Sequence, residues 1–425
     1  MTAGTTSTKI PDTRFPNTGI SGDGSPNAPF GSNMAQRGTS QSGVRIYNER
    51  LVLSLIRARD SLPKAEIARL TGLSAQTVSV IVRQLEQEGL LLKGDSLKGK
   101  VGQPLQPFSL KPDGAYSIGL KIGRRSCNLI CLDFLGNPCA RHDQVYGYPT
   151  PSVVLRIARE GLQHIERELG PDKASRICGI GIASPFELWN WAQETGAPPQ
   201  AMASWHGVNI AAEIGALSAW PVQFCNDATA ACAAELFLGR GRTMRDFICF
   251  YVGFFVGGGV VLNGNLFPGR TGYAGAVGPM PVPTANGTEQ LIRHASLYVL
   301  ENMLAAAGKD PLALTRQTES WDNIGSLLDD WIDLTAHSLA HAALSAASII
   351  DFEAVIIDGS MPANVRRKLV DKTVEYFTKQ DARGIAPLAI VEGVLGGDAR
   401  ALGAASLPII TNFMINREVL FKESL

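Results

Sequence analysis

The sequence predicts an α/β protein in which a short, mainly helical module precedes a body of two α/β lobes. Its 425 residues are enough for two or three folded units. From about residue 115 onward, apolar strand-like runs alternate with amphipathic helices, and a second series of such runs follows the first. Hydrophobic residues make up 45% of the chain, which excludes a wholly disordered protein. The longest apolar run falls far short of the ~20 residues of a membrane span.

The N-terminal segment, residues 1 to about 43, is dominated by Thr, Ser, Gly, Pro and Asn and has no apolar periodicity. We therefore expect a disordered tail there. The N-terminus has no basic region followed by an apolar core. The seven cysteines are odd in number and scattered, unlike a disulfide framework. Together these features predict a protein of the reducing cytoplasm.

The net charge is zero, with 39 basic and 39 acidic residues, but the charge is segregated along the chain. Between Arg45 and Lys111, eleven basic residues face six acidic ones, a net charge of +5. The tail carries +1, so residues 112 to 425 carry −6. A basic module joined to an acidic body points to an anionic partner for the module alone.

The basic module, residues 44 to 112, begins with helical apolar spacing at Leu51, Leu53, Leu55 and Ile56. The next stretch predicts a helix over 64–70, a turn over 71–73 and a second helix that Ser74 caps. Gly72 allows the turn conformation that a side chain would resist. A seam of apolar residues would lock the two helices into a helix-turn-helix: Ala68, Leu73, Val78 and Ile81.

This arrangement turns the start of the second helix outward, and short polar residues there approach base edges. Beyond Gly89 the sequence predicts two strands around a Lys/Gly-rich loop, a wing. We therefore predict that the module binds DNA; the alternative is a helix-turn-helix used only for packing or dimerisation. The candidate DNA-binding residues are Ser74, Ala75, Gln76, Thr77, Ser79 and Arg83 on the helix, and Lys98 and Lys100 on the wing.

The body contains two series of strand-like runs. The first series is YSIGLKIG, CNLICLDFLG, RICGIGIA and PVQFCND, with a hairpin at Gly136 and a helix from Ser152 to Leu169. The second series is DFICFYVG, VGGGVVLNG, AVIIDGS and APLAIVEGVLGG. The repeat is weak in sequence, but it predicts two lobes with mixed sheets and a cleft between them.

The order of these motifs carries a resemblance. A helix-turn-helix with a wing, followed by SIGLKIG, GIGIASP, FCNDATAACAAELFLGRG, VGGGVVLNGNLFPG and GYAGAVG, resembles the ROK family of sugar kinases and repressors over about residues 45 to 425. The resemblance implies an actin/hexokinase-like (ribonuclease H-like) body over 113–425 that forms dimers or tetramers and binds a sugar between its lobes. The first lobe would span about 113–228 plus the C-terminal helix, and the second about 229–400.

In such kinases the catalytic base is the Asp of an Asn-Asp pair, and Asn226 and Asp227 match that pair here. An amide and a carboxylate suit the recognition of sugar hydroxyls. The alternative is a purely structural role, in which an Asn-Asp pair after a strand only forms a turn. We predict that Asn226 and Asp227 bind an effector in the cleft, with Asp227 catalytic only if the protein is an active kinase.

The phosphate-binding segments differ from the family pattern. Lys121, Arg124 and Arg125 replace the acidic residue, Gly and Thr of the first segment. Phe254 and Phe255 stand in the second, where a small hydroxyl residue and a glycine let the backbone approach a phosphate. We therefore expect no kinase activity and no cofactor.

The metal and sugar signatures are also altered. Ala276 and Pro279 occupy the family's Glu and His positions, the following cysteine cluster is missing, and Ala201 aligns with a sugar-contacting Asn. A closed zinc site needs four ligands, so we expect no metal. Aromatic residues that could stack on a sugar, or equally belong to a core or interface, border the cleft in the family: Trp189, Trp191 and Trp205, with His206 beside them.

Three hypotheses follow. The first, which we prefer, is a regulator, most simply a repressor, of carbohydrate-related genes: a homo-oligomer binds a palindromic double-stranded operator, and a carbohydrate or derivative in the cleft changes lobe closure and the spacing of the recognition helices. The second is an active ATP-dependent sugar kinase that also regulates. The third is a scaffold whose cleft binds nothing and whose body docks a partner protein.

Overall fold

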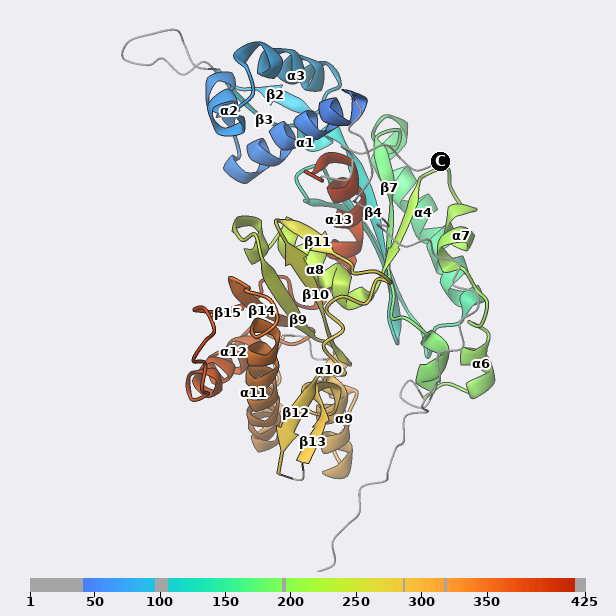
Figure 1. Ribbon diagram of the computed structural model, residues 1–425. Coiled ribbons are helices and arrows are strands. Elements are labelled where there is room, and N and C mark those ends of the chain that lie inside the picture. The colour runs from blue at the N-terminus through green and yellow to red at the C-terminus, as the bar shows by residue number, and fades with distance from the viewer. Residues whose placement is uncertain (1–40, 96–105, 193–195, 286, 317–318, 417–425) are drawn as a thin grey trace, which may run out of the picture.

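The computed structural model describes residues 41–95, 106–192, 196–285, 287–316 and 319–416. These residues form a winged helix-turn-helix module and a body of two α/β lobes. In Figure 1 the module lies at one end of the molecule, above both lobes. The predicted order of units is therefore confirmed.

The winged module consists of three helices and a small antiparallel sheet of order β1-β3-β2. Its helix α1 begins at Gln41, within the segment that we expected to be tail. The module's core contains Val52, Ile56, Ile67, Val78 and Leu85, all nearly inaccessible to solvent. The elements are α1 (Gln41–Arg59), β1 (Leu62–Pro63), α2 (Lys64–Thr71), α3 (Ala75–Gln87), β2 (Leu91–Lys93) and β3 (Pro107–Leu110).

The first lobe is built on a five-stranded sheet of order β6-β5-β4-β7-β8. Every residue of the central strand β4 is buried, as expected for a strand covered on both faces, whereas β6 at the edge is largely exposed. Gly136 forms the predicted hairpin between β5 and β6 with φ +92°. The elements are β4 (Tyr116–Ile122), β5 (Ser126–Asp133), β6 (Pro138–Val145), α4 (Pro151–Ala174), β7 (Ile177–Ala183), α6 (Pro199–Ala203), α7 (Ile210–Gly215) and β8 (Val222–Cys225), with 3-10 turns η2 (Pro112–Gly114) and η3 (Leu188–Trp191).

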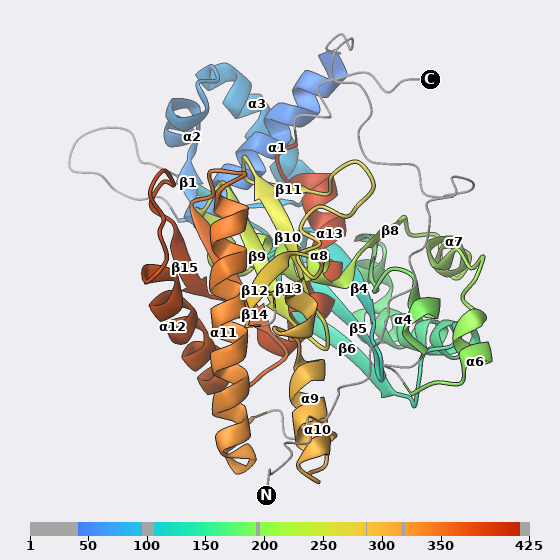
Figure 2. The same ribbon diagram turned by 60° about the horizontal axis from the view of Figure 1, so that its bottom comes forward.

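The second lobe is built on a sheet of order β11-β10-β9-β14-β15. Its largest helices, α11 and α12, pack against each other beside this sheet (Figure 2). The elements are α8 (Asp227–Phe237), β9 (Phe247–Val252), β10 (Val256–Leu262), β11 (Asn265–Phe267), β12 (Pro281–Thr284), β13 (Gly287–Gln290), α9 (Leu297–Ala306), α10 (Ala313–Arg316), α11 (Ser326–Ala347), β14 (Ala354–Gly359), α12 (Ala363–Thr378), β15 (Ala389–Glu392) and α13 (Ala399–Phe413), with 3-10 turns η4 (Arg240–Thr243), η5 (Leu291–Arg293), η6 (Asp322–Ile324) and η7 (Gly396–Asp398).

The two lobes share one topology. In each sheet the first three strands of the lobe form an antiparallel meander, and the last two strands add in parallel on the other side of the first strand. The repeat that is weak in the sequence is therefore clear in the fold.

Each lobe ends in a helix that packs on the other lobe. Helix α8 follows β8 of the first lobe but lies against β9 and β10 of the second, and α13 follows β15 of the second lobe but lies against β4 and β7 of the first. The two helices also pack on each other, in the centre of the molecule (Figure 1). A Cβ atom on Gly403 of α13 would lie 1.7 Å from the carbonyl oxygen of Ala230 on α8, so only glycine permits this approach.

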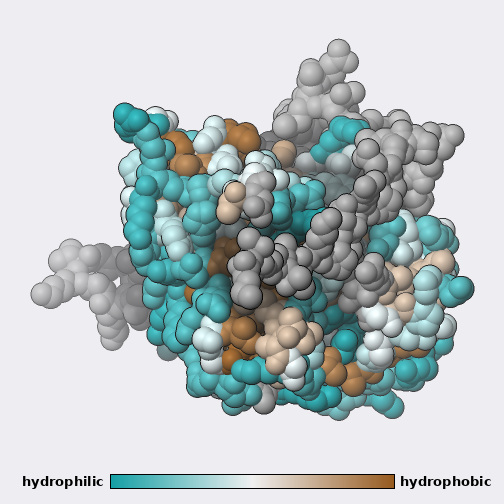
Figure 3. All heavy atoms as spheres, turned by 90° about the horizontal axis from the view of Figure 1, so that it is seen from below, coloured by the Kyte–Doolittle hydropathy of each residue, from teal (hydrophilic) through white to brown (hydrophobic). Residues whose placement is uncertain are grey.

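The face of the molecule that is seen from below is mainly hydrophilic. Figure 3 views the molecule from below and shows small groups of hydrophobic residues on a mostly hydrophilic face. Across the described ranges, no helix combines the length and the apolar character that crossing a membrane requires.

Candidate nucleic-acid interface and ligand cleft

The helix-turn-helix is formed by local signals that the structure shows directly. Gly72 ends α2 with φ +72°, the left-handed conformation that favours glycine. Ser74 caps α3, because its Oγ accepts a hydrogen bond from the backbone N–H of Thr77 at 3.0 Å. The side-chain oxygens of Ser74 and Thr77 lie 2.8 Å apart, so both residues also hold the start of the helix.

The outward face of α3 presents a compact set of side chains. Gln76, Ser79 and Arg83 are exposed, as is Ala75 at the first position of the helix. Val80 lies on the same face and is 61% exposed. Val80 was not among the predicted contacts, although its helical spacing from Gln76 and Arg83 places it between them. An exposed apolar side chain on a recognition helix suits the methyl group of thymine.

The wing is present as the antiparallel pair β2 and β3, in which Leu91 pairs with Leu110 and Lys93 with Phe108. Lys93 is exposed at the end of β2. The two predicted wing contacts, Lys98 and Lys100, lie outside the described residues.

The winged module is fastened to the body through Arg57 on α1. Its guanidinium donates to the carbonyl oxygens of Phe134 at 3.1 Å, Leu135 at 3.3 Å and Phe237 at 3.0 Å. The same group lies 3.4 Å from the centroid of the Phe237 ring. Because Phe237 is the last residue of α8, one side chain of the module contacts the end of a helix that begins in the body's cleft.

A second attachment joins α1 to the C-terminal helix. The Oγ of Ser54 accepts a hydrogen bond from the backbone N–H of Ile415 at 2.9 Å, just beyond the end of α13. Ile409 of α13 and Phe237 of α8 belong to the same apolar cluster as the module's own core. The module therefore rests on the ends of both central helices.

The cleft between the lobes contains a cavity of about 310 Å³. Asn226 and Asp227 line it at the start of α8, together with Arg400 in the first turn of α13. The side chain of Asn226 also caps α8, because its Oδ1 accepts from the backbone N–H of Ala228 at 3.0 Å. One oxygen of Asn226 therefore has the purely structural role of capping the helix. Both Asn226 and Asp227 also line the cavity.

An ion pair lies in this wall. The Oδ2 of Asp227 accepts a hydrogen bond from the guanidinium of Arg400 at 3.1 Å, and the two side chains are 17% and 16% exposed. Arg400 also donates to the Oγ of Ser360 at 3.2 Å. Arg400 could not be identified from the sequence, because no local signal marks the exchange of helices that brings α13 to the cleft.

The segment with Lys121, Arg124 and Arg125, at the position of the family's first phosphate-binding segment, forms a contact between the lobes. Arg124, in the turn between β4 and β5, forms two hydrogen bonds to Glu301 on α9, at 2.6 and 3.1 Å. Its guanidinium lies 3.5 Å from the centroid of the Phe254 ring. Lys121 is buried, and its Nζ donates a hydrogen bond to the Oγ of Ser126 at 2.9 Å. Burial is the larger cause, and the nearby positive charge of Arg400 the smaller one, that together lower the pKa of Lys121 to about 7.

Aromatic side chains of both lobes meet in the cleft. Phe255 in the β9–β10 turn packs against Trp191 of η3, with ring centroids 4.4 Å apart. Phe186, which follows β7, packs against Tyr273 of the second lobe at 4.6 Å. All four residues line the cavity. Phe186 and Tyr273 were not among the predicted cleft residues, although Phe186 directly follows the GIGIASP run and Tyr273 lies within GYAGAVG.

The other aromatic residues predicted to border the cleft do not line the cavity. Trp205 is 3% exposed in the core of the first lobe, and its Nε1 donates to the carbonyl oxygen of Pro149 at 3.0 Å. The ring of Trp189 stacks on that of His206 at 4.8 Å. Only Trp191 of this group reaches the cavity, while the Ala276 and Pro279 positions also line it.

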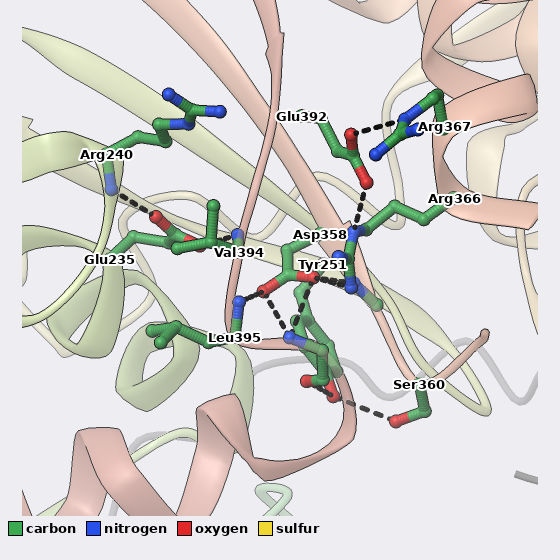
Figure 4. A network of polar contacts seen from close by, with 12 residues as sticks. Glu235, Arg240, Tyr251, Asp358, Ser360, Arg366, Arg367, Glu392, Val394 and Leu395 are labelled. Atoms are coloured by element: carbon green, nitrogen blue, oxygen red, sulfur yellow. Dashed lines mark hydrogen bonds and ion pairs between the residues drawn. The ribbon is translucent and has the colours of Figure 1, made fainter. Parts of the chain in front are cut away.

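A buried polar network contacts α8 near the C-terminal end of the helix (Figure 4). Glu235 accepts from the backbone N–H groups of Arg240 and Val394, at 2.8 and 2.9 Å. Asp358 at the end of β14 accepts from Leu395 and Gly396 and pairs with Arg366 at 3.2 Å. Burial raises the pKa of Glu235 to about 7 and also raises that of Asp358. The network ties α8 to the loop that leads into α13.

Comparison with known proteins gives two family matches. Residues 117–296 match the model of the ROK family, and residues 47–91 match a model described as winged helix-turn-helix DNA-binding. The xylose repressor of Bacillus subtilis (strain 168) is 25% identical over 57% of this chain and 62% of its own length. This chain therefore matches less than two thirds of that repressor.

Two solved structures share the fold. A ROK family transcriptional regulator, a homolog of the E. coli MLC protein, superposes with a TM-score of 0.63 and 17% identity, over 89% of this chain and 99% of its own. A ROK family glucokinase from Streptomyces griseus, solved with glucose and AMPPNP, gives 0.53 and 20% identity, over 69% of this chain and 99% of its own. The second match covers a smaller part of this chain.

Proposed function

Because the chain belongs to the ROK family and carries a winged helix-turn-helix DNA-binding module, we propose that it is a transcriptional repressor whose operator affinity responds to a small molecule in the cleft. In this account the protein acts in the cytoplasm as a homo-oligomer. Each winged module contacts one half-site of a palindromic operator. The effector is a carbohydrate or a derivative of one, and the genes controlled serve carbohydrate use.

One observation carries the proposal: the two helices that begin at the cleft end at the winged module. Asp227 is the first residue of α8 and Phe237, which contacts Arg57, is the last. Arg400 lies in the first turn of α13, and the backbone just beyond that helix contacts Ser54. A ligand that bound the Asp227–Arg400 end would therefore act on the same rigid elements that hold the module.

Close packing makes these helices suitable for transmitting a movement. The contact of Gly403 with Ala230 leaves no room for α13 to slide freely on α8. Because α8 packs on the second lobe and α13 on the first, a change in lobe closure must change the relation of the two helices. The affinity for DNA changes only if a ligand binds the two lobe arrangements with different free energies.

We propose that the contacts that cross the cleft differ between two arrangements of the lobes. Arg124 with Glu301, and Trp191 with Phe255, join the lobes at the cavity. A ligand that entered the cavity would compete with or reinforce these contacts, and so bias closure. This is the means by which we propose that effector binding reaches the operator.

The same geometry argues against phosphoryl transfer. Asp227, which would act as the base, has one oxygen engaged by Arg400. The turn that would offer backbone N–H groups to phosphates carries the rings of Phe254 and Phe255 instead. We therefore propose that the protein is not a sugar kinase, although its fold is shared with one.

The test of the proposed function is a gel shift with the DNA upstream of the protein's own gene, set beside a scrambled sequence of equal length. We expect selective, salt-sensitive retardation of the upstream DNA. Equal binding to both sequences would contradict the proposal. A coupled ATP-consumption assay over a panel of sugars, with Asp227→Ala as the control, tests the kinase alternative: sugar-dependent turnover that this variant loses would support it.

A further inference from the structure

The wall of the cleft divides into two chemically different parts. Hydrogen-bonding side chains line it at the starts of α8 and α13, where Asn226, Asp227 and Arg400 lie, and the lining has further polar side chains in Arg124, Glu187 and Thr229. Aromatic rings form much of the remainder, from Phe186, Trp191, Phe254, Phe255 and Tyr273. The volume of about 310 Å³ lies at the lower end of the range of small-molecule pockets.

The polar part has groups with spare hydrogen-bonding capacity. Asn226 uses its Oδ1 to cap α8, which leaves the Nδ2 group as a donor. Asp227 uses Oδ2 for Arg400, which leaves Oδ1 as an acceptor. A donor and an acceptor on adjacent residues match a hydroxyl group, which both donates and accepts.

The aromatic part is a cluster of rings that are tilted to one another, with interplanar angles of 57° for Phe254 and Phe255 and 40° for Trp191 and Phe255. The rings of Phe254 and Phe255 lie 4.5 Å apart, and Trp191 extends the cluster on the opposite lobe at 4.4 Å from Phe255. The guanidinium of Arg124 covers one face of Phe254 and is itself paired with Glu301. This wall offers a free hexose few partners for its hydroxyl groups, and burying a hydroxyl without a partner is unfavourable.

From this division we propose that the cleft takes a glycoside with an aromatic substituent: the hydroxylated ring lies at Asn226 and Asp227, and the aryl group packs on Phe254, Phe255 and Trp191. The inference rests on the proposed function, since it names the class of effector for the same cleft. Aromatic pairs contribute beyond the area that they bury. The aryl group is therefore expected to raise affinity about tenfold or more over a methyl group at the same position.

The experiment measures the affinity of the full chain for matched pairs of glycosides by calorimetry. The probes are phenyl and methyl glycosides of glucose and of xylose, in both anomeric forms. We expect at least one phenyl glycoside to bind at least tenfold more tightly than its methyl partner. Equal affinities within every pair, or no binding by any probe at millimolar concentration, would overturn the proposal.

Matched variants test where in the cleft the preference for phenyl glycosides arises. Phe255→Leu keeps an apolar side chain but removes the ring, and we expect it to reduce the phenyl preference at least threefold. Phe267→Leu is the control, because Phe267 is an exposed residue of β11 that does not line the cavity. A phenyl preference that Phe255→Leu leaves intact would contradict the assigned position.

Operator binding by the same preparation separates this inference from the proposed function. A protein that binds its operator selectively but shows no phenyl preference refutes the assigned effector class and leaves the repressor intact. A protein that prefers phenyl glycosides but binds no DNA selectively supports the ligand class and refutes the repressor.

Discussion

Asp227 and Arg400, 173 positions apart in the sequence, form an ion pair between the first turns of two helices, and both side chains line the cleft. The pair joins the helix that follows the first lobe's last strand to the helix that follows the second lobe's last strand. The same two helices carry the winged module at their other ends.

The first prediction concerns this ion pair. Asp227→Asn leaves a largely buried guanidinium without its carboxylate, so we expect a loss of about 2 kcal/mol in the free energy of unfolding. Arg400→Gln leaves the carboxylate of Asp227 without its guanidinium partner, so we expect a similar loss. The double variant should lose less than the sum of the two, with a coupling energy of about 1 kcal/mol or more. Urea unfolding of the four proteins measures this; strictly additive losses would exclude a direct interaction.

The second prediction concerns the attachment of the winged module. Arg57→Ala removes three hydrogen bonds to main-chain oxygens and the contact with the Phe237 ring. We expect faster amide hydrogen exchange in α1 and a loss of about 2 kcal/mol in stability. Arg59→Ala, on the exposed end of the same helix, is the matched control. Unchanged exchange in α1 after Arg57→Ala would mean that the module does not depend on this contact.

The third prediction concerns sequence readout. Gln76→Ala and Val80→Ala each remove an exposed side chain from the outward face of α3. Each should relax the preference at one base pair of the half-site by about 1–3 kcal/mol, while other positions stay as selective as before. Competition with operator variants that each carry one altered base pair checks this. Glu213→Ala, on α7 of the body, should leave every preference unchanged.

The fourth prediction concerns the wing. Lys98→Ala or Lys100→Ala should weaken binding to all sequences by a similar factor and should lower the slope of log affinity against log salt by about 1. Fluorescence anisotropy over a salt series measures both quantities. A change of sequence preference without a change of salt slope would assign these lysines to base readout instead.

The fifth prediction concerns pH. Burial raises the pKa of Glu235 from 4.5 to about 7, so the folded protein keeps a proton that the unfolded chain loses above about pH 4.5. The stabilisation present below pH 4.5 is therefore lost as the pH rises through 7. Glu235→Gln has no proton to lose, so its stability relative to the native protein should improve between pH 5 and pH 8, by on the order of 2 kcal/mol.

Denaturant midpoints at pH 5, 6.5 and 8 measure this difference. Glu213→Gln is the control for a general charge effect, because Glu213 is an exposed residue of α7 in the first lobe. A difference between Glu235→Gln and the native protein that stays constant with pH would refute the assignment of the titration to this network.

The parts of the fold that depend on neighbouring residues could be predicted from the sequence. Gly72 and Ser74 mark the turn and the cap of the helix-turn-helix, and both signals act within three residues. The hairpin at Gly136 is local in the same way. The strands of the body follow from apolar runs, because a strand buried on both faces has little choice of composition.

The cleft could be predicted only in part. Asn226 and Asp227 were identified through a resemblance that spans most of the chain, and both line the cavity. Arg400, Phe186 and Tyr273 reach the same cavity only because the lobes and their end helices come together, which no periodicity records. Trp205 shows the converse: its apolar neighbours place it in a core, and sequence alone did not separate that role from a place in the cleft.

The most direct test of the central claim is selection of binding sites from random double-stranded DNA by the full chain, followed by sequencing. We predict an enriched motif of two inverted half-sites whose centres lie about one helical turn apart or a multiple of it, and whose enrichment falls when Gln76 is replaced by alanine. The absence of any enriched motif at low salt, with the protein folded, would contradict the account that this chain reads an operator.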